Sequence, residues 1–111
     1  MNRGGRPAGG APDAFAALAD PTRRLLLERL AGGELTVGAL GDGLAISQAA
    51  VSQHLRLLRD TGLVSVRAAG RSRLYRLRPD GFADLRGWLD ELDRFWATRV
   101  AALDAFLEEG T

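Results

Sequence analysis

Cysteine and lysine are both absent from this 111-residue sequence. Without cysteine, the chain can form no disulfide, thiolate metal site, thiol redox sensor or cysteine nucleophile. No apolar run approaches the roughly 20 residues that span a bilayer, and the glycine-rich start lacks the apolar segment of a secretory signal. These absences predict a cytoplasmic protein that makes no contact with a membrane.

All fifteen basic residues are arginine, whose planar guanidinium suits bidentate contacts with phosphate and guanine. The net charge of +1 hides a strong asymmetry along the chain. Residues 46–79 contain seven arginines and one acid, whereas residues 80–111 contain eight acids and three arginines. Because an anionic partner responds to the local field, the central segment is expected to bind nucleic acid and the last segment to stay away from it.

The length predicts a single domain with a modest core. Residues 1–12 hold four glycines, two prolines and two arginines, a composition that predicts a disordered tail. A basic arm that probes DNA is the alternative for this segment. Residues 13–111 are expected to fold as one domain.

Four helices are predicted before residue 61, over 13–19, 21–31, 35–44 and 47–60. Each has, at or next to its start, a residue whose side chain can cap a helix N-terminus; in chain order these are Asp13, Asp20, Thr36 and Ser47. Three glycines weaken the third helix, so tertiary packing must hold it. Residues 63–78 alternate as two strands turning at Gly70, and 80–109 has the pattern of a long helix.

The fourth predicted helix has two contrasting faces. At 100° per residue, Val51, Leu55 and Leu58 share one face, which we expect to be buried. The remaining surface is small and polar near the N-terminus and cationic further on; it carries Ser47, Gln48, Ala49, Ser52, Gln53, His54 and Arg56. Serine and glutamine can hydrogen-bond to base edges, which predicts contact with the DNA major groove. An ordinary amphipathic surface helix is the alternative, but it does not explain why glutamate is missing from the exposed face.

His54 lies at the edge of the buried face, where a backbone carbonyl or a phosphate is a more ordinary partner than a metal. Ser47, His54 and Asp60 do not share a face, so they form no catalytic set. No other paired acid and base residues are evident, and we expect neither enzymatic activity nor a cofactor.

The predicted hairpin carries Arg67, Arg71 and Arg73 around Gly70. Glycine adopts the positive φ of a tight turn at little cost. A basic tip beside a helix that enters the major groove is expected to grip flanking phosphates or to enter the minor groove. A solvated loop is the alternative.

The last predicted helix would be roughly 45 Å long at 1.5 Å per residue, more than a small domain can cover. Its apolar residues recur every three or four positions, which predicts burial against a second copy of the chain. The expected dimer interface consists of Phe15, Leu18, Leu85, Leu89, Leu92, Trp96, Val100 and Leu103. A bend near Gly87 that folds the end back is the alternative.

Two blocks of the sequence, "ALADPTRRLLLERLAGGELTVGAL" and "ISQAAVSQHLRLLRDTGLVSVRAAGRSRLYRL", resemble the ArsR family of bacterial repressors over nearly all of residues 13–106. The resemblance implies a mainly α-helical winged helix-turn-helix fold with a small β-hairpin. It assigns 36–60 to the helix-turn-helix, 63–78 to the wing and 80–109 to a dimerisation helix. It also implies a homodimer that binds palindromic double-stranded operator DNA and responds to a small-molecule inducer of unknown identity.

The sequence departs from the metal-sensing members of that family. Where those members carry cysteines in the third helix, this chain has Thr36, Val37 and Gly38. The last helix has carboxylates but no histidine, and carboxylates alone make a poor site for soft metals. We therefore predict no metal site and a metal-independent repressor, with its own operon as one candidate target. The alternative is a winged-helix protein-interaction module that binds nucleic acid only non-specifically.

Overall fold

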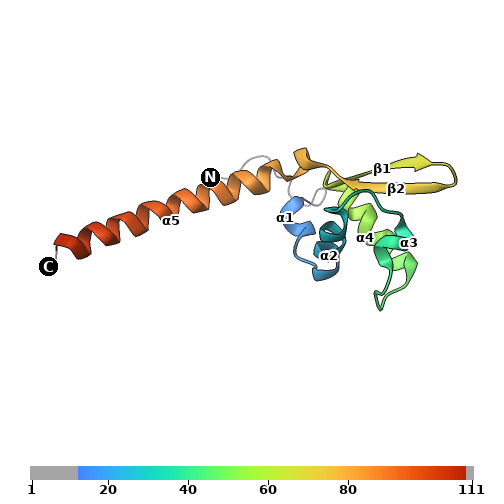
Figure 1. Ribbon diagram of the computed structural model, residues 1–111, viewed down its shortest axis with the longest axis horizontal. Helices are drawn as coiled ribbons and strands as arrows, with labels where there is room; N and C mark the ends of the chain where they lie inside the picture. Colours follow the sequence, from blue (N-terminus) through green and yellow to red (C-terminus); the bar gives the residue numbers. More distant parts are fainter. Residues whose placement is uncertain (1–12, 110–111) are drawn as a thin grey trace.

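The computed structural model describes residues 13–109, so the predicted tail 1–12 lies outside the described residues. A small helical core carries a hairpin at one end, and a long helix projects from the other (Figure 1). In chain order the elements are α1 (Ala14–Ala17), α2 (Pro21–Leu30), α3 (Val37–Gly41), α4 (Gln48–Asp60), β1 (Val64–Ala69), β2 (Ser72–Leu77), a 3₁₀ turn (Pro79–Phe82) and α5 (Ala83–Glu109). This order confirms the predicted winged helix-turn-helix class.

The four predicted N-caps are confirmed. In each case a side-chain oxygen accepts a hydrogen bond from the backbone N–H three residues on: 2.8 Å at Asp13, 3.0 Å at Asp20, 3.2 Å at Thr36 and 3.1 Å at Ser47. These bonds satisfy amide groups that the first turn of a helix leaves without a partner. Local sequence therefore fixes where these four helices begin.

The third helix is shorter than the predicted 35–44. Leu35 lies in a β-bridge, donating its N–H to the Tyr75 carbonyl (3.1 Å) and accepting from the Tyr75 N–H (2.8 Å). The helix ends at Gly41, and Gly43 has a φ of 77°. The helix is therefore shortened at both ends of this glycine-rich segment. The backbone pairing of Leu35 with Tyr75 prevents an earlier start, and the turn at Gly43 prevents a later end.

The core is entirely apolar in the part of the chain that is described. The predicted inward faces are confirmed: Leu26, Leu27 and Leu30 of α2 and Val51, Leu55 and Leu58 of α4 are buried. The other large members are Leu40, Leu63, Val64 and Tyr75. The apolar side of α4 is therefore fixed against the domain, and its opposite side faces solvent.

Strands β1 and β2 form the predicted hairpin, with Val64 opposite Leu77 and Ala69 opposite Ser72. Gly70 begins the two-residue turn with a φ of 63°, as a type II′ turn requires. Directly opposed residues share a face, so Tyr75 faces the core together with Val66, whereas Arg67 and Arg76 lie on the other face. The Arg78 N–H donates to the Leu63 carbonyl (2.9 Å) and extends the ladder by one bond.

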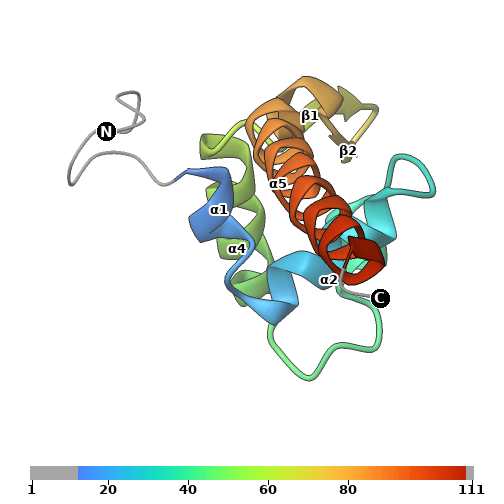
Figure 2. The ribbon, with the colours of Figure 1, turned by 90° about the vertical axis from the view of Figure 1, so that its left-hand side faces the viewer.

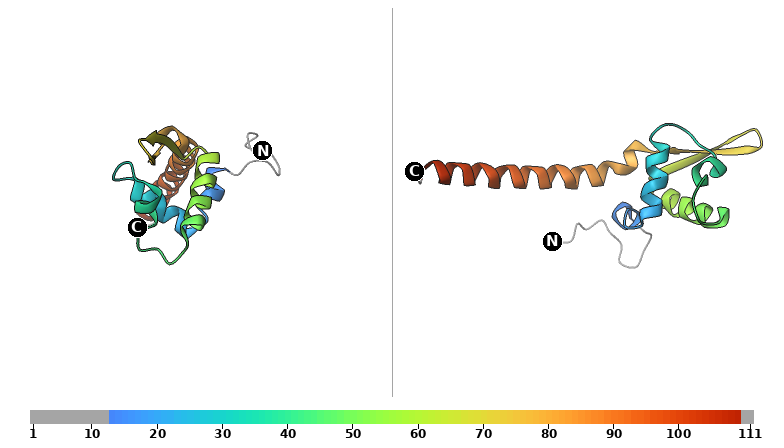
Figure 3. Two further views of the ribbon diagram at one scale, coloured as in Figure 1. Left: turned by 90° about the vertical axis from the view of Figure 1, so that its right-hand side faces the viewer. Right: turned by 60° about the horizontal axis from the view of Figure 1, so that its bottom comes forward.

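Helix α5 is continuous from Ala83 to Glu109, so the alternative of a bend near Gly87 is wrong. The predicted first turn, from Asp80, is instead the 3₁₀ turn. Only the start of α5 contacts the domain, where Leu85 is buried. The rest extends away from it, as the right-hand view of Figure 3 shows, whereas Figure 2 looks nearly along the helix. The described part of the chain contains no helix that is both long enough and apolar enough to cross a membrane.

Candidate nucleic-acid interface

Helices α3 and α4 and the hairpin occupy the end of the domain away from the projecting part of α5 (Figure 3). Helix α3 is held by Arg29 of α2, whose Nη1 donates to the carbonyls of Leu40 (2.7 Å) and Asp42 (2.8 Å). These bonds satisfy carbonyls at a helix C-terminus, where a cation is also favourable. Arg29 thereby fixes the turn that leads from α3 into α4.

The outer side of α4 is exposed along its whole length. We call this exposed surface the reading face; it consists of Ser47, Gln48, Ala49, Ser52, Gln53 and Arg56. It carries short polar groups near the helix start and a cation one turn later. The Ser47 Oγ already accepts the capping bond, but its hydroxyl hydrogen can still donate to a base or phosphate.

The reading face has the chemistry and the dimensions of a major-groove surface. A B-DNA major groove, about 12 Å wide, admits one α-helix, and amide and hydroxyl groups there can distinguish base pairs. A helix N-terminus also attracts a phosphate through its free amides and its dipole. The structure brings together all the predicted α4 residues except His54, which is half-buried.

All three predicted arginines of the hairpin are exposed, but they differ in whether an acid of the chain holds them. Arg71 lies in the turn and Arg73 follows it on β2; both are exposed, and within residues 13–109 neither takes part in an ion pair. Arg73 and Arg67 lie on opposite faces of the ribbon. The tip therefore offers two free cations to an anionic partner.

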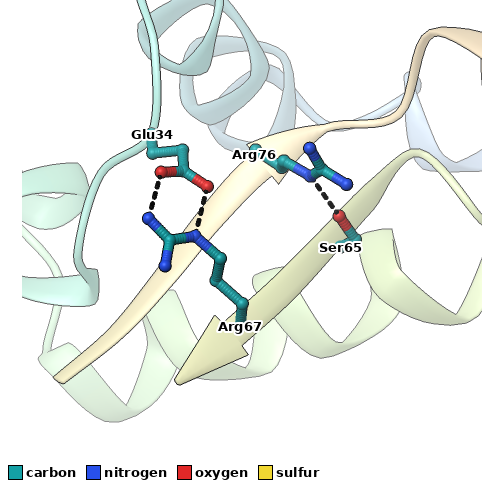
Figure 4. A network of polar contacts seen from close by, with 4 residues as sticks. All are labelled: Glu34, Ser65, Arg67 and Arg76. Carbon is teal, nitrogen blue, oxygen red and sulfur yellow. Dashed lines mark hydrogen bonds and ion pairs between the residues drawn. The ribbon is translucent and has the colours of Figure 1, made fainter. Parts of the chain in front are cut away.

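Arg67 is held differently from the other two. Its Nε and Nη2 donate to the two carboxylate oxygens of Glu34, both at 2.8 Å (Figure 4). The Arg67 guanidinium lowers the pKa of Glu34, and the nearby charge of Arg76 lowers it further. Arg76 itself donates to the Ser65 Oγ (3.2 Å). The charge of Arg67 is thus balanced within the chain.

His54 faces the interior side of α4 and meets an arginine of α2. The Nη1 of Arg23 lies 3.4 Å from the His54 Nδ1. The Nε of Arg23 donates to the Ala17 carbonyl (2.8 Å), and its Nη2 donates to that of Ala16 (3.4 Å). The backbone N–H of Arg23 lowers the pKa of the Asp20 carboxyl, and the charge of Arg23 acts in the same direction.

The predicted dimer interface is only partly free in the single chain. Leu85 is buried and Leu18 packs against the core, so both are used within their own chain. Phe15 makes an edge-to-face contact with Trp88 at 5.8 Å between ring centroids, which joins α1 to α5. The other five predicted residues are exposed, among them Trp96 at 58% and Leu103 at 55%.

Three structurally important residues could not be found from the sequence pattern: Arg23, Arg29 and Glu34. Their partners lie 31, 11 and 33 residues away, respectively, beyond the reach of helical or strand periodicity. Between residues 13 and 109, no group of three histidine, aspartate or glutamate side chains is arranged so that it could hold a metal ion.

Residues 20–66 match a family model described as bacterial regulatory protein, arsR family. The HTH-type transcriptional regulator Rv2034 of Mycobacterium tuberculosis is 54% identical over 86 residues, which cover 77% of this chain and 78% of that protein. The transcriptional repressor SdpR of Bacillus subtilis is 33% identical over 75 residues, covering 68% and 83%. A crystal structure of an ArsR family transcriptional regulator superposes with a TM-score of 0.68 at 34% identity, covering 75% of this chain and 91% of that one.

Proposed function

The chain belongs to the arsR family of bacterial regulatory proteins and is a DNA-binding transcriptional regulator, not an enzyme; from this premise we propose that it is a homodimeric, metal-independent repressor of a palindromic operator. The reading face of α4 enters the major groove, and Arg71 and Arg73 contact the flanking phosphates. The observation that carries this proposal is the burial of Val51, Leu55 and Leu58, which leaves serine and glutamine side chains exposed on the opposite side.

The surface of α5 supports the proposed dimer. Leu85, Trp96 and Leu107 are eleven residues apart, and such a spacing keeps side chains nearly in line along a straight helix. Four more apolar residues lie between them on the same side of the helix: Leu89, Leu92, Val100 and Leu103. We call these seven residues together the apolar stripe. All members of the stripe except Leu85 are exposed. Large exposed apolar surfaces mark interaction sites, and a second copy of the chain offers an identical stripe to cover this one.

Two-fold symmetry sets the geometry of the DNA site. A dimer formed through the same surface on both subunits presents two copies of α4 related by that symmetry. Such a dimer binds two half-sites about one helical turn apart, which is the arrangement of an inverted repeat. The acidic α5 is kept away from the phosphates, since residues 80–111 carry eight acids and three arginines.

The available side chains support the proposed metal independence. The chain has no cysteine and a single histidine, His54, whose Nδ1 faces Arg23. Carboxylates remain on α5, including Asp84, Asp90 and Glu91, but oxygen ligands alone do not select soft transition metals. Added zinc or a chelator should therefore leave DNA binding unchanged.

A competition mobility-shift experiment tests the proposal. The labelled probe is the DNA immediately upstream of the protein's own gene, and the competitors are the same duplex unlabelled and a scrambled duplex of equal composition. Specific binding predicts that the complex survives an excess of scrambled DNA and is displaced by the unlabelled probe. Equal displacement by both would instead indicate a protein-interaction module that binds nucleic acid non-specifically.

A further inference from the structure

A set of contacts connects α1, α2 and α4 at one point of the domain. Arg23 projects from the first turns of α2 and reaches both of the other helices. Its Nε and Nη2 donate to α1 carbonyls, at 2.8 Å to Ala17 and 3.4 Å to Ala16. Its Nη1 lies 3.4 Å from the Nδ1 of His54, in the second turn of α4. Figure 2 shows α1 lying against α4 in this region.

The contact fixes the chemistry of the histidine. Arginine has only donors and stays protonated at all ordinary pH values. The Nδ1 of His54 must therefore accept the hydrogen bond, which places the ring proton on Nε2. The planar guanidinium uses separate N–H groups for each partner, so one side chain can hold α1 and α4 together.

We infer that Arg23 is a positioning residue for DNA recognition, which sets the placement of α4 relative to α1 by hydrogen-bonding to His54. This inference rests on the proposed role of α4 as the helix that enters the major groove. His54 lies one residue after Gln53 and two after Ser52, so a shift of its backbone moves the reading face with it. Because α1 also meets α5 through Phe15 and Trp88, the same arginine ties the placement of α4 to the base of α5.

The neighbouring Arg24 provides a matched control. Its Nη1 donates to the Leu18 carbonyl of the same α1 C-terminus at 2.6 Å. Among the hydrogen bonds and ion pairs within residues 13–109, none joins the Arg24 side chain to α4. Substituting alanine for either arginine removes the same charge and a contact with α1, but only the change at Arg23 removes the bond to His54.

The test measures the affinities of the full-length protein for the upstream duplex and for the scrambled duplex at fixed salt. Arg23→Ala and His54→Ala should each lower the ratio of these affinities by about tenfold, the size of effect that one lost charge-assisted hydrogen bond can have. The double variant should be no worse than either single variant, because the two changes remove one interaction. Arg24→Ala should change both affinities alike and leave the ratio intact.

Conservative replacement separates positioning by His54 from direct DNA contact. His54→Asn places an amide oxygen where Nδ1 accepts from Arg23 but removes the Nε2–H donor. It should recover most of the affinity ratio lost in His54→Ala, whereas a direct contact through Nε2 would leave the ratio as low as in His54→Ala. Thermal unfolding confirms that each variant is folded.

Two outcomes would overturn the inference. If the parent discriminates between the duplexes but Arg23→Ala and Arg24→Ala have the same ratio, Arg23 does not position α4 and the proposed function stands. Additive losses in the double variant would likewise show that the two residues act separately. If the parent does not discriminate at all, it is the proposed function that fails.

Discussion

At the residue scale, Gly81 allows the 3₁₀ turn before α5 to lie directly against the chain that leaves α4. A Cβ at this position would collide with the carbonyl oxygen of Gly62 and lie 3.2 Å from the Cα of Leu63. Backbone atoms cannot move aside as a flexible side chain can. Gly81→Ala should therefore lower the free energy of unfolding by about 3 kcal/mol, measured by urea denaturation.

Gly87 is the control for this prediction. It lies within α5, and nothing is within 4 Å of the position that its Cβ would occupy. Gly87→Ala should raise the free energy of unfolding by about 0.5 to 1 kcal/mol, because alanine favours a helix interior. Equal effects of the two substitutions would show that the close approach at Gly81 is unimportant.

We expect Glu34 to compete with a DNA phosphate for Arg67. Because Glu34 holds the guanidinium of Arg67 in a two-point ion pair, Glu34→Gln should release Arg67 for a phosphate. The plot of log affinity against log salt should then steepen by about 0.9, the value for one additional phosphate contact. Glu28→Gln makes the same charge change at an exposed site of α2 and should leave the slope unchanged; equal slopes in both variants would exclude Arg67 as a phosphate contact.

At the scale of the elements, features set by residues close together in the sequence could be predicted. Features that depend on residues far apart in the sequence could not. A cap involves residues three apart, and the buried stripes of α2 and α4 follow from periodicity, so both could be predicted from the sequence. The shortening of α3 could not, because it depends on the pairing of Leu35 with Tyr75, forty residues away. The same limit applies to the reading face: periodicity predicted its exposed residues, but not that Arg23 holds His54.

The N-cap of α2 should make stability depend on pH. The Arg23 N–H stabilises the ionised carboxylate of Asp20 and lowers its pKa below the ordinary value of 3.8. The stabilisation is fully present above pH 3.8 and is lost as the pH falls through the lower pKa of the folded state. Asp20→Asn keeps a capping oxygen but cannot ionise.

The Asp20 prediction is measured as the difference in Tm between the parent and Asp20→Asn across acidic pH. The parent's advantage should be constant at neutral pH and should shrink below pH 3.8. Comparison with the variant cancels the contributions of Glu34 and Asp80, whose pKa values are also lowered. A difference that does not change with pH would contradict the role assigned to the ionised cap.

At the scale of the whole molecule, the radius of gyration is 19.1 Å, whereas a compact domain of about 100 residues has about 13 Å. The excess reflects α5, whose apolar side chains beyond Leu85 are exposed. The sequence predicted this surplus of apolar surface. It did not predict that Leu85 and Leu18 would be covered by their own chain, since that depends on how the start of α5 packs.

Trp96→Glu tests the proposed dimer. A charge in the middle of the apolar stripe should produce monomers in sedimentation velocity and weaken binding to the upstream duplex by about a hundredfold, since the second half-site no longer adds to affinity. Ala101→Glu introduces the same charge on the opposite side of α5 and should remain dimeric. An intact Trp96→Glu dimer would show that the stripe is not the interface.

The most direct test of the central claim, that the reading face of α4 recognises bases, is selection of duplexes from a random pool by the parent and by Gln53→Ala. The parent should enrich an inverted repeat with half-sites about 10 base pairs apart, and Gln53→Ala should lose base preference at one symmetric position in each half-site while keeping the rest. Enrichment of the same complete motif by both proteins, or of no motif by the parent, would contradict the claim.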